Sequence, residues 1–269
     1  MPSHSLWLNL DRLNSQLLTA EDIGILTDAD GTLAEIQDFP ELASVPEDIA
    51  SMLGRLNRLY KLVAVVSGRR AADVQALVGQ VELLYLGNHG LERRRGVSTQ
   101  KTPAGLQAYT AVADAGVELA LRLPKAPGLF IENKGSVLAV HYRQCDDPAA
   151  IDAAKELTAE LAAKFDLRAQ HGRKVSEIRP LAADKGLAVL EVAREYGVKQ
   201  IIYIGDDETD IDAFKALRAA SDRHEISSVT IAVLGPESPP GLADNGDYVV
   251  ESIDEVARFF SWLIDRAAF

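Results

Sequence analysis

The sequence contains a single cysteine, Cys145, among its 269 residues. One thiol cannot form a disulfide within the chain, and it excludes metal sites built from several cysteines. Long apolar runs are also missing. No run approaches the roughly 20 residues of a membrane-spanning helix, and residues 1–19 lack a basic segment followed by an apolar block. These absences predict a protein of the reducing cytoplasm.

Basic residues are scarce relative to acidic ones. The chain has 28 Lys and Arg against 40 Asp and Glu, which gives a net charge of −12. This charge repels nucleic acids and anionic membranes at long range, so we expect neither as a partner. An anionic small-molecule substrate would need a local positive pocket or a metal. The hydrophobic share of 47% is ordinary for a soluble globular protein, and the length allows one large domain or two smaller ones.

Strand-like and helix-like segments alternate in the first and last parts of the chain. This alternation is typical of an α/β fold with a doubly wound parallel sheet. The expected strands are residues 23–27, 62–66, 83–86, 200–204, 229–234 and 248–250. The expected helices are residues 6–18, a helix opened by Pro46, and residues 71–78, 184–196, 209–219 and 253–264.

The middle of the chain breaks this alternation. Helical patterns at 103–123 and 148–165 are mixed with strand patterns at 128–132, 137–143, 167–170 and 174–179. Helices and hairpin-like strands in this mixture indicate an inserted α+β domain. We therefore expect residues 1–92 and 182–269 to form one domain and residues 93–181 to form a second.

Polar residues follow several of the expected parallel strands. Asp28, Ser67, Gly87 and Asp206 each come after a strand end, and the carboxyl ends of parallel strands meet at one edge of a sheet, where ligands bind. Asp28 and Asp30 lie two residues apart and repel each other unless a cation, a proton or N–H groups compensate. Taken alone, the pair fits a strand-end turn equally well. The convergence of distant segments favours a functional site.

Several carboxylates surround the expected start of the helix at residue 209. They are Asp206, Asp207, Glu208, Asp210 and Asp212. One or two acids would suffice to cap a helix, each contributing about 0.3 to 1 kcal/mol. The surplus beside Asp28 and Asp30 makes an oxygen-rich site that suits Mg²⁺. A calcium-binding EF-hand loop fits poorly, because its required glycine and final glutamate would be Ile211 and Leu217.

Two further residues complete a phosphoryl-transfer site. Lys185 follows Asp184 in the first turn of a helix, where a cation opposes the helix dipole unless it holds an approaching anion. Ser67 could donate its hydroxyl to phosphate, although a surface lysine and a turn serine remain alternatives. In such a site Asp28 attacks phosphorus and forms an acyl phosphate, while Asp30 acts as acid and then as base. Mg²⁺ and Lys185 would stabilise the charge on the transferring group.

These segments resemble the four motifs of the haloacid dehalogenase superfamily, in the same order. The segments are Asp28-Ala29-Asp30-Gly31-Thr32-Leu33, Ser67-Gly68-Arg69, Lys185 and Gly205-Asp206-Asp207-Glu208-Thr209-Asp210. The resemblance implies a Rossmann-like core with an inserted cap. It also implies that Asp28 is the nucleophile, that Asp30 is the acid/base, and that Ser67 and Lys185 hold phosphate. Mg²⁺ ligands would come from Asp28, the Asp30 carbonyl and Asp206, with Asp207 and Asp210 at or near the metal.

A finer resemblance points to the trehalose-6-phosphate phosphatases. It is carried by residues 87–92, 132–134, 141–143, 173–180 and 184–186, most of them in the inserted domain. The resemblance implies a cap that closes over the sugar and a functional link to a trehalose-6-phosphate synthase. The implied substrate-binding residues are Gly31, Thr32, Gly68, Arg69, His89, Glu132, Lys134, His141, Arg143, Arg173, Lys174 and Glu177. Ala29 and Ile211 depart from the family pattern, which usually has an aromatic residue and Glu there.

The charged residues of the inserted domain also have a physical interpretation. In an extended strand Glu132 and Lys134 share one side, as do Arg173 and Glu177. Any single one fits a solvated sheet face, but a face with acids and bases offers acceptors and donors to a polyhydroxyl ligand. The expected function is a Mg²⁺-dependent trehalose-6-phosphate phosphatase. The alternatives are a capped phosphatase for sucrose phosphate or mannosylphosphoglycerate, and a non-catalytic sugar-phosphate-binding regulatory domain.

Overall fold

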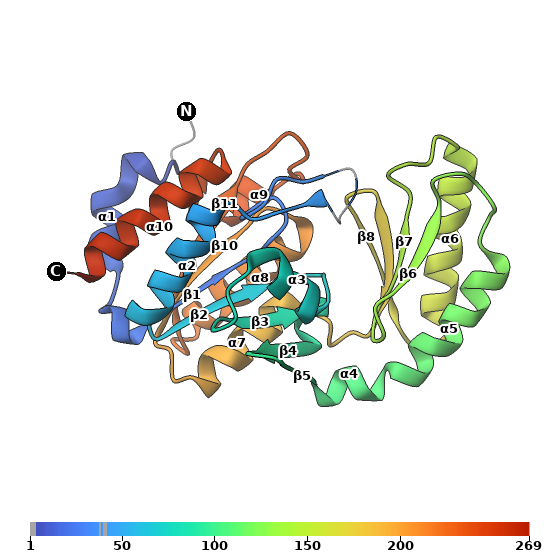
Figure 1. The fold of residues 1–269 in the computed structure, drawn as a ribbon, viewed down its shortest axis with the longest axis horizontal. Coiled ribbons are helices and arrows are strands. Elements are labelled where there is room, and N and C mark those ends of the chain that lie inside the picture. Colours follow the sequence, from blue (N-terminus) through green and yellow to red (C-terminus); the bar gives the residue numbers. More distant parts are fainter. Residues whose placement is uncertain (1–3, 38, 40–41, 269) are drawn as a thin grey trace. The chain divides into compact units, whose positions relative to one another are not determined.

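The structure, a computed structural model, describes residues 4–37, 39 and 42–268. The chain divides into two compact units, which we describe separately (Figure 1). Unit 1 combines Met1–Thr99 with Asp184–Phe269, and unit 2 is Gln100–Ala183. None of the helices in the described part of the chain is both long and apolar enough to span a bilayer.

An eight-stranded sheet forms the centre of unit 1, and its strand order is β12-β11-β10-β1-β2-β3-β4-β5. The strands are β1 (Ile23–Thr27), β2 (Leu62–Val66), β3 (Leu84–Gly87), β4 (Glu92–Arg95), β5 (Ser98–Lys101), β10 (Gln200–Gly205), β11 (Ser227–Val233) and β12 (Tyr248–Val250). All neighbours from β12 to β3 pair in parallel, whereas β3 and β4 are antiparallel. The α/β fold expected from the alternation of elements is confirmed.

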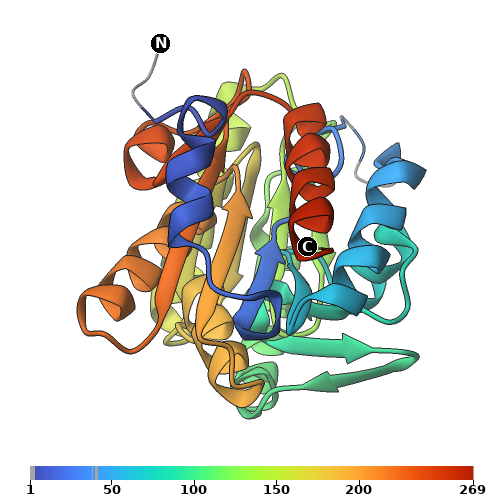
Figure 2. The ribbon, with the colours of Figure 1, turned by 90° about the vertical axis from the view of Figure 1, so that its left-hand side faces the viewer.

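Helices cover both faces of this sheet (Figure 2). Alternate residues of β1 point to opposite faces, so that Ile25 joins one core cluster and Leu26 the other. The first cluster is covered by α1 (Leu10–Gln16), α2 (Glu47–Leu59), α3 (Ala71–Val78) and α10 (Ile253–Ala267). The second is covered by α7 (Lys185–Glu195), α8 (Glu208–Asp222) and α9 (Leu242–Asn245). This layering leaves the carboxyl ends of the strands available for a site.

The sequence did not predict the hairpin of β4 and β5, which extends the sheet. Its strands are polar, and β5 is exposed along its length. Besides the pairing of β4 with β3, polar side chains hold the hairpin. Arg94 donates to Gln75 and to the main-chain carbonyl of Val97, and buried Glu92 accepts from the N–H of Ala71 at the start of α3. The helix expected at 6–18 is also shorter, with a 3₁₀ turn η1 (Trp7–Asn9) before α1. Two more 3₁₀ turns are η2 (Ala20–Asp22) and η4 (Asn88–Gly90).

Unit 2 is a four-stranded antiparallel sheet with helices packed on one face. Its strand order is β6 (Phe130–Asn133), β7 (Leu138–His141), β9 (Val175–Arg179) and β8 (Arg168–Gly172). Leu138, Val140 and Ile178 form a core with α5 (Tyr109–Arg122) and α6 (Pro148–Lys164). The helix expected over 103–123 is divided into α4 (Pro103–Gln107) and α5. The hydroxyl of Ser136 donates to the carbonyl of Gly105, to which the N–H of Tyr109 would bond in a continuous helix.

Candidate functional site

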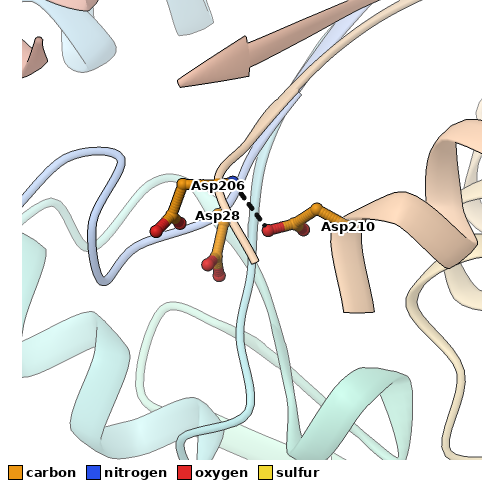
Figure 3. A group of neighbouring side chains, drawn as sticks. All are labelled: Asp28, Asp206 and Asp210. Carbon is orange, nitrogen blue, oxygen red and sulfur yellow. Dashed lines mark hydrogen bonds between the residues drawn. The ribbon is translucent and has the colours of Figure 1, made fainter. Parts of the chain in front are cut away.

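The two central strands of unit 1 bring two aspartates to the same edge of the sheet. Thr27 on β1 pairs with Ile204 on β10, and the N–H of Asp28 donates to the Ile204 carbonyl at 2.8 Å. Asp28 and Asp206 therefore leave their strands side by side, and both are buried. Carboxylate oxygens of Asp28, Asp206 and Asp210 lie within 4.8 Å of one another (Figure 3).

A tight turn after β1 holds Asp206 from the other side. The N–H of Gly31 donates to Ala34 O at 2.7 Å, and Gly31 has φ +83°, a conformation that favours glycine. A Cβ at this position would lie 2.0 Å from Asp206 Oδ2. The buried hydroxyl of Thr32 donates to Asp206 Oδ1 at 3.0 Å. Gly31 and Thr32 thus contact a carboxylate of unit 1, and they fix its orientation.

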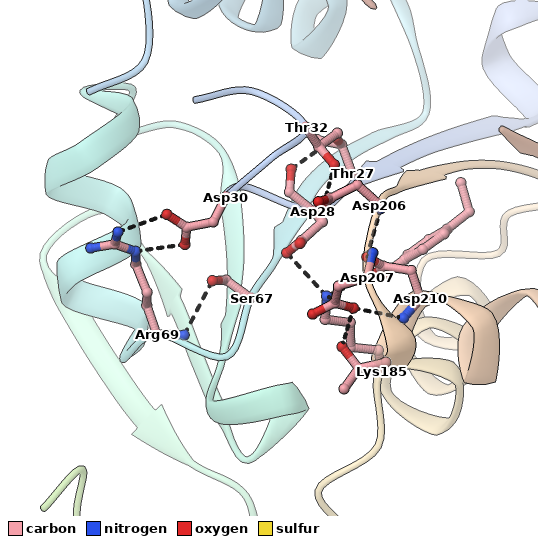
Figure 4. Close-up of polar contacts among 12 residues, drawn as sticks. Thr27, Asp28, Asp30, Thr32, Ser67, Arg69, Lys185, Asp206, Asp207 and Asp210 are labelled. Atoms are coloured by element: carbon pink, nitrogen blue, oxygen red, sulfur yellow. Dashed lines mark hydrogen bonds and ion pairs between the residues drawn. The ribbon is translucent and has the colours of Figure 1, made fainter. Parts of the chain in front are cut away.

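Lys185 is the first residue of α7 and points into the acidic group (Figure 4). The side chain of Asp184 accepts from the N–H of Leu187 and so caps α7. This cap makes Lys185 the first residue of the helix. The Lys185 ammonium lies 3.1 Å from Asp28, 2.8 Å from Asp210 and 3.5 Å from Asp207. Its side chain is only 1% exposed. An ammonium at the start of a helix is thereby held inside the protein by carboxylates.

The charges of this group shift the pKa values of its members. Burial raises the pKa of Asp28 well above its usual value; Lys185 opposes this shift, and the nearby carboxylates add to it. Burial also raises the pKa of Asp210, to about 7. Burial alone would lower the pKa of Lys185, but Asp207, Asp210 and Asp28 raise it well above its usual value. Asp28, Asp206, Asp207 and Asp210 thus share the one ammonium of Lys185, and burial together with their mutual repulsion disfavours ionisation of all four at once.

The donors fit a hard divalent cation. Mg²⁺ prefers oxygen ligands and usually takes one or two protein carboxylates together with waters and substrate oxygens. Asp28 and Asp206 supply buried carboxylates at one edge of the sheet, and a cation there would offset the repulsion between their ionised forms. Asp210 is the third carboxylate of this group, but its oxygens accept hydrogen bonds from Lys185, Tyr203 and the N–H groups of Asp206 and Asp207.

Asp30 points towards Arg69 and away from Lys185 (Figure 4). Its two oxygens accept from Nε and Nη2 of Arg69, both at 2.7 Å, in a bidentate pair. The Ser67 hydroxyl accepts from the N–H of Arg69 at 3.1 Å. Ser67 and Asp30 are thus tied to the same arginine, as Figure 4 shows.

His89 is packed against the loop that contains Ser67. It is buried at the end of β3, has φ +56°, and donates its N–H to the Ser67 carbonyl at 3.0 Å. A Cβ on Gly68 would lie 2.9 Å from the His89 ring. Gly68 and His89 therefore fit against each other, and the glycine permits that close approach.

A second polar group lies on the sheet of unit 2, on the face opposite its helices. The Lys134 ammonium lies 2.9 Å from Glu177 on β9 and 4.0 Å from Glu132 on β6, and His141 Nε2 lies 2.9 Å from Glu132. Lys134 and Glu177 are buried. Arg143 follows the end of β7, and residues 173–174 form the turn between β8 and β9. In the register of the sheet, Ala139 pairs with Glu132 on one side and with Glu177 on the other, so these three residues lie in one row across the strands.

The structure thus brings most of the expected residues into two groups, one in each unit, whereas Arg143, Arg173 and Lys174 lie after β7 and in the turn between β8 and β9. In unit 1 it joins Asp28, Gly31, Thr32, Lys185, Asp206, Asp207 and Asp210 through direct contacts, and it joins Asp30 and Ser67 through Arg69. Tyr203 was not predicted as a site residue, yet its buried hydroxyl donates to Asp210 at 2.7 Å. A tyrosine inside an otherwise apolar strand was an available signal, because a buried hydroxyl requires a partner.

Comparison with known proteins identifies the family. The model of the trehalose-phosphatase family matches residues 26–240, which include every residue named in both groups. The chain belongs to the trehalose-phosphatase family. Its resemblance to the trehalose-6-phosphate phosphatases, stated from the sequence motifs, is confirmed.

The chain matches different shares of the length of its individual relatives. An uncharacterized glycosyl hydrolase of Mycobacterium tuberculosis is 36% identical over 212 residues, which are 76% of this chain but 16% of that protein. The trehalose-phosphate phosphatase of Mycobacterium marinum is 34% identical over 84% of this chain and 61% of its own length. The chain therefore spans only part of these relatives.

A solved structure supports the fold of this family member. The C-terminal domain of Candida albicans trehalose-6-phosphate phosphatase superposes with a TM-score of 0.76 at 20% identity, covering 91% of this chain and 93% of that domain. At this identity the likeness establishes the fold and leaves the activity to chemical argument.

Proposed function

We propose that this protein is a Mg²⁺-dependent phosphatase that hydrolyses trehalose 6-phosphate to trehalose and phosphate. The observation that carries the proposal is the ion pair of Lys185 with Asp28, 3.1 Å apart, beside buried Asp206. A nucleophilic carboxylate, a phosphate-binding ammonium and a second carboxylate for a cation are the parts that phosphoryl transfer needs. Members of the family with this activity support the choice of substrate.

The proposed reaction has two steps, both at Asp28. In the first step an Asp28 oxygen attacks phosphorus, the bond from phosphorus to the sugar oxygen breaks, and Asp30 gives a proton to the leaving oxygen. In the second step water attacks the phosphorus of the aspartyl phosphate, Asp30 takes a proton from that water, and the bond to Asp28 breaks. Inorganic phosphate leaves, and both carboxyl groups return to their starting states.

The other groups of unit 1 orient and neutralise the phosphoryl group. Lys185 and the Ser67 hydroxyl would bind its oxygens, and Asp28 and Asp206 would hold Mg²⁺. Bound there, the cation supplies positive charge to the transferring group. Arg69 donates to both oxygens of the Asp30 carboxylate, so that Asp30 must separate from Arg69, at least partly, to take up the proton that it gives in the first step.

We assign recognition of the sugar to unit 2, Gln100–Ala183, which makes up most of the inserted domain expected at residues 93–181 and which we propose to be the cap of this enzyme. The polar group of Glu132, Lys134, His141 and Glu177 offers charged donors and acceptors for hydroxyl groups. A site built on such bonds discriminates against ligands that leave them unpaired. We further propose a cytoplasmic location and a functional link to a trehalose-6-phosphate synthase.

A panel of phosphate esters tests this proposal. Phosphate release is measured with Mg²⁺ on trehalose 6-phosphate, sucrose 6-phosphate, mannosylphosphoglycerate and glucose 6-phosphate, with Asp28→Asn as the blank. We expect the highest kcat/KM for trehalose 6-phosphate. Equal or faster turnover of glucose 6-phosphate would contradict the assignment of substrate. Binding of trehalose 6-phosphate without turnover of any ester would indicate the non-catalytic regulatory domain instead.

A further inference from the structure

Asp210 differs from the other acids of the site in how fully its oxygens are used. Its Oδ1 accepts from the Lys185 ammonium at 2.8 Å and from the Tyr203 hydroxyl at 2.7 Å. Its Oδ2 accepts from the N–H groups of Asp206 at 2.9 Å and Asp207 at 3.1 Å. A carboxylate has about four lone-pair positions, so these donors occupy the group completely. Asp210 therefore connects the lysine, the tyrosine and the backbone that presents Asp206.

Tyr203 enters this connection from the sheet. It lies on β10, is fully buried, and packs edge-to-face against Phe214 on α8, with 5.9 Å between the ring centroids. The packed ring leaves the hydroxyl little freedom, and its single proton goes to Asp210. A phenylalanine would fill the core equally well at this position. Packing alone therefore does not explain the presence of a hydroxyl group at this position.

We propose that Tyr203 is a positioning residue of the phosphatase, which acts through Asp210 to fix the Lys185 ammonium beside Asp28. The contacts run from the Tyr203 hydroxyl to Asp210 Oδ1, from there to Lys185 Nζ, and on to Asp28 Oδ1 at 3.1 Å. The kinetic part of this inference rests on the proposed function. The consequence of this inference is that one phenolic oxygen, three contacts away from Asp28, helps to set where phosphate binds.

Three carboxylates lie near enough to attract the Lys185 ammonium. Asp207 Oδ1 lies 3.5 Å from the ammonium, farther than Asp210 or Asp28. With both Tyr203 and Lys185 on one oxygen, the Asp210 carboxylate is held in a single rotation. Without the hydroxyl this oxygen loses one of its two donors, and the lysine can follow the carboxylate or move towards Asp207. Either movement changes the distance of 3.1 Å between the ammonium and Asp28.

The matched variants Tyr203→Phe and Tyr85→Phe test the proposal. Tyr85 is also fully buried in the sheet, and its hydroxyl donates to the main-chain carbonyl of Gln80. Each variant thus removes one buried, bonded hydroxyl. We expect Tyr203→Phe to lower kcat/KM for trehalose 6-phosphate about 10-fold, since one hydrogen bond to a charged group is at stake. We expect Tyr85→Phe to leave kcat/KM unchanged, although it also loses stability through its missing hydrogen bond. Equal kinetic losses in both variants, or none in Tyr203→Phe, would overturn the proposal.

A binding measurement separates this inference from the proposed activity. Affinity for inorganic phosphate is measured by calorimetry for the wild type, Tyr203→Phe, Lys185→Met and the double variant. We expect Tyr203→Phe to weaken phosphate binding several-fold when Lys185 is present and to have no effect when it is Met. The same weakening in both backgrounds would show that Tyr203 does not act through the lysine. If the wild type binds phosphate but hydrolyses no ester, the proposed function fails while this cycle still decides the role of Tyr203.

Discussion

Gly31→Ala is the sharpest single test of the geometry at the edge of the sheet. Gly31 has φ +83°, and the added Cβ would lie 2.0 Å from Asp206 Oδ2, whereas ordinary contacts begin at 3.4 Å. One of the two groups must therefore move by more than an ångström. Gly79→Ala is the matched control, because Gly79 has φ +76° at the end of α3 and nothing within 4 Å of its Cβ position.

The two substitutions separate backbone strain from displacement of the carboxylate. A left-handed conformation costs a residue with a Cβ roughly 1 to 2 kcal/mol, and both variants lose this much stability. Only Gly31→Ala also moves Asp206, which is buried and fixed by Thr32. A misplacement of about 1 Å in a catalytic site can cost on the order of 100-fold in rate. We expect this loss in kcat/KM for Gly31→Ala and no loss for Gly79→Ala.

Phosphate release measures kcat/KM, and thermal unfolding measures stability, on the same samples. The Mg²⁺ concentration for half-maximal rate should rise for Gly31→Ala, because the displaced carboxylate is a proposed ligand. If both variants lose stability equally and Gly31→Ala keeps its rate and its Mg²⁺ dependence, Asp206 does not hold the cation in the way proposed.

Three further predictions concern other parts of the site. Asp28→Asn should abolish turnover and leave the fold intact, since burial and neighbouring carboxylates already disfavour the charge of Asp28; circular dichroism melts check the fold, and retained turnover would remove Asp28 from the nucleophile role. Mg²⁺ at 100 times its dissociation constant should stabilise the wild type by about 2.7 kcal/mol; melts with and without EDTA measure this, and an equal effect in Asp206→Asn would contradict the assigned ligand. Glu177→Gln should raise KM for trehalose 6-phosphate about 10-fold or more, because its ion pair with Lys134 is buried; a small ester such as p-nitrophenyl phosphate serves as the comparison, and equal changes on both substrates would make Glu177 structural.

The sequence was sufficient to predict the convergence of Asp28 and Asp206. Both follow apolar runs of strand length, and a parallel sheet places the ends of its strands at one edge. The observed register, with Thr27 opposite Ile204, is the direct expression of that rule. The hairpin β4–β5 could not be predicted in the same way. It carries little apolar periodicity, and side-chain bonds to Gln75 and Val97 help to hold it.

Side-chain partners across the chain were less accessible to sequence analysis. Arg69 and Asp30 are 39 residues apart, and their bidentate pairing depends on the loop after β2 turning back towards the loop after β1. The sequence indicated Arg69 only through a resemblance, as a residue that binds substrate. The structure shows that Arg69 also pairs with Asp30, the proposed acid/base, and this pairing cannot be read from the motifs.

The acidic segment after β10 shows most clearly what distinguishes composition from function. Asp206, Asp207 and Asp210 are alike as carboxylates, and the sequence assigned all of them to a metal site. Hydrogen bonds separate them: Asp210 is occupied by donors on both oxygens, and Asp207 caps α8 by accepting from the N–H of Asp210 and the hydroxyl of Thr209. Asp206 instead faces Asp28 across the edge of the sheet. If the proposed cation binds here, Asp210 would affect it chiefly by holding Lys185 and the backbone of Asp206, and Asp28 and Asp206 would be the side chains best placed to bind it.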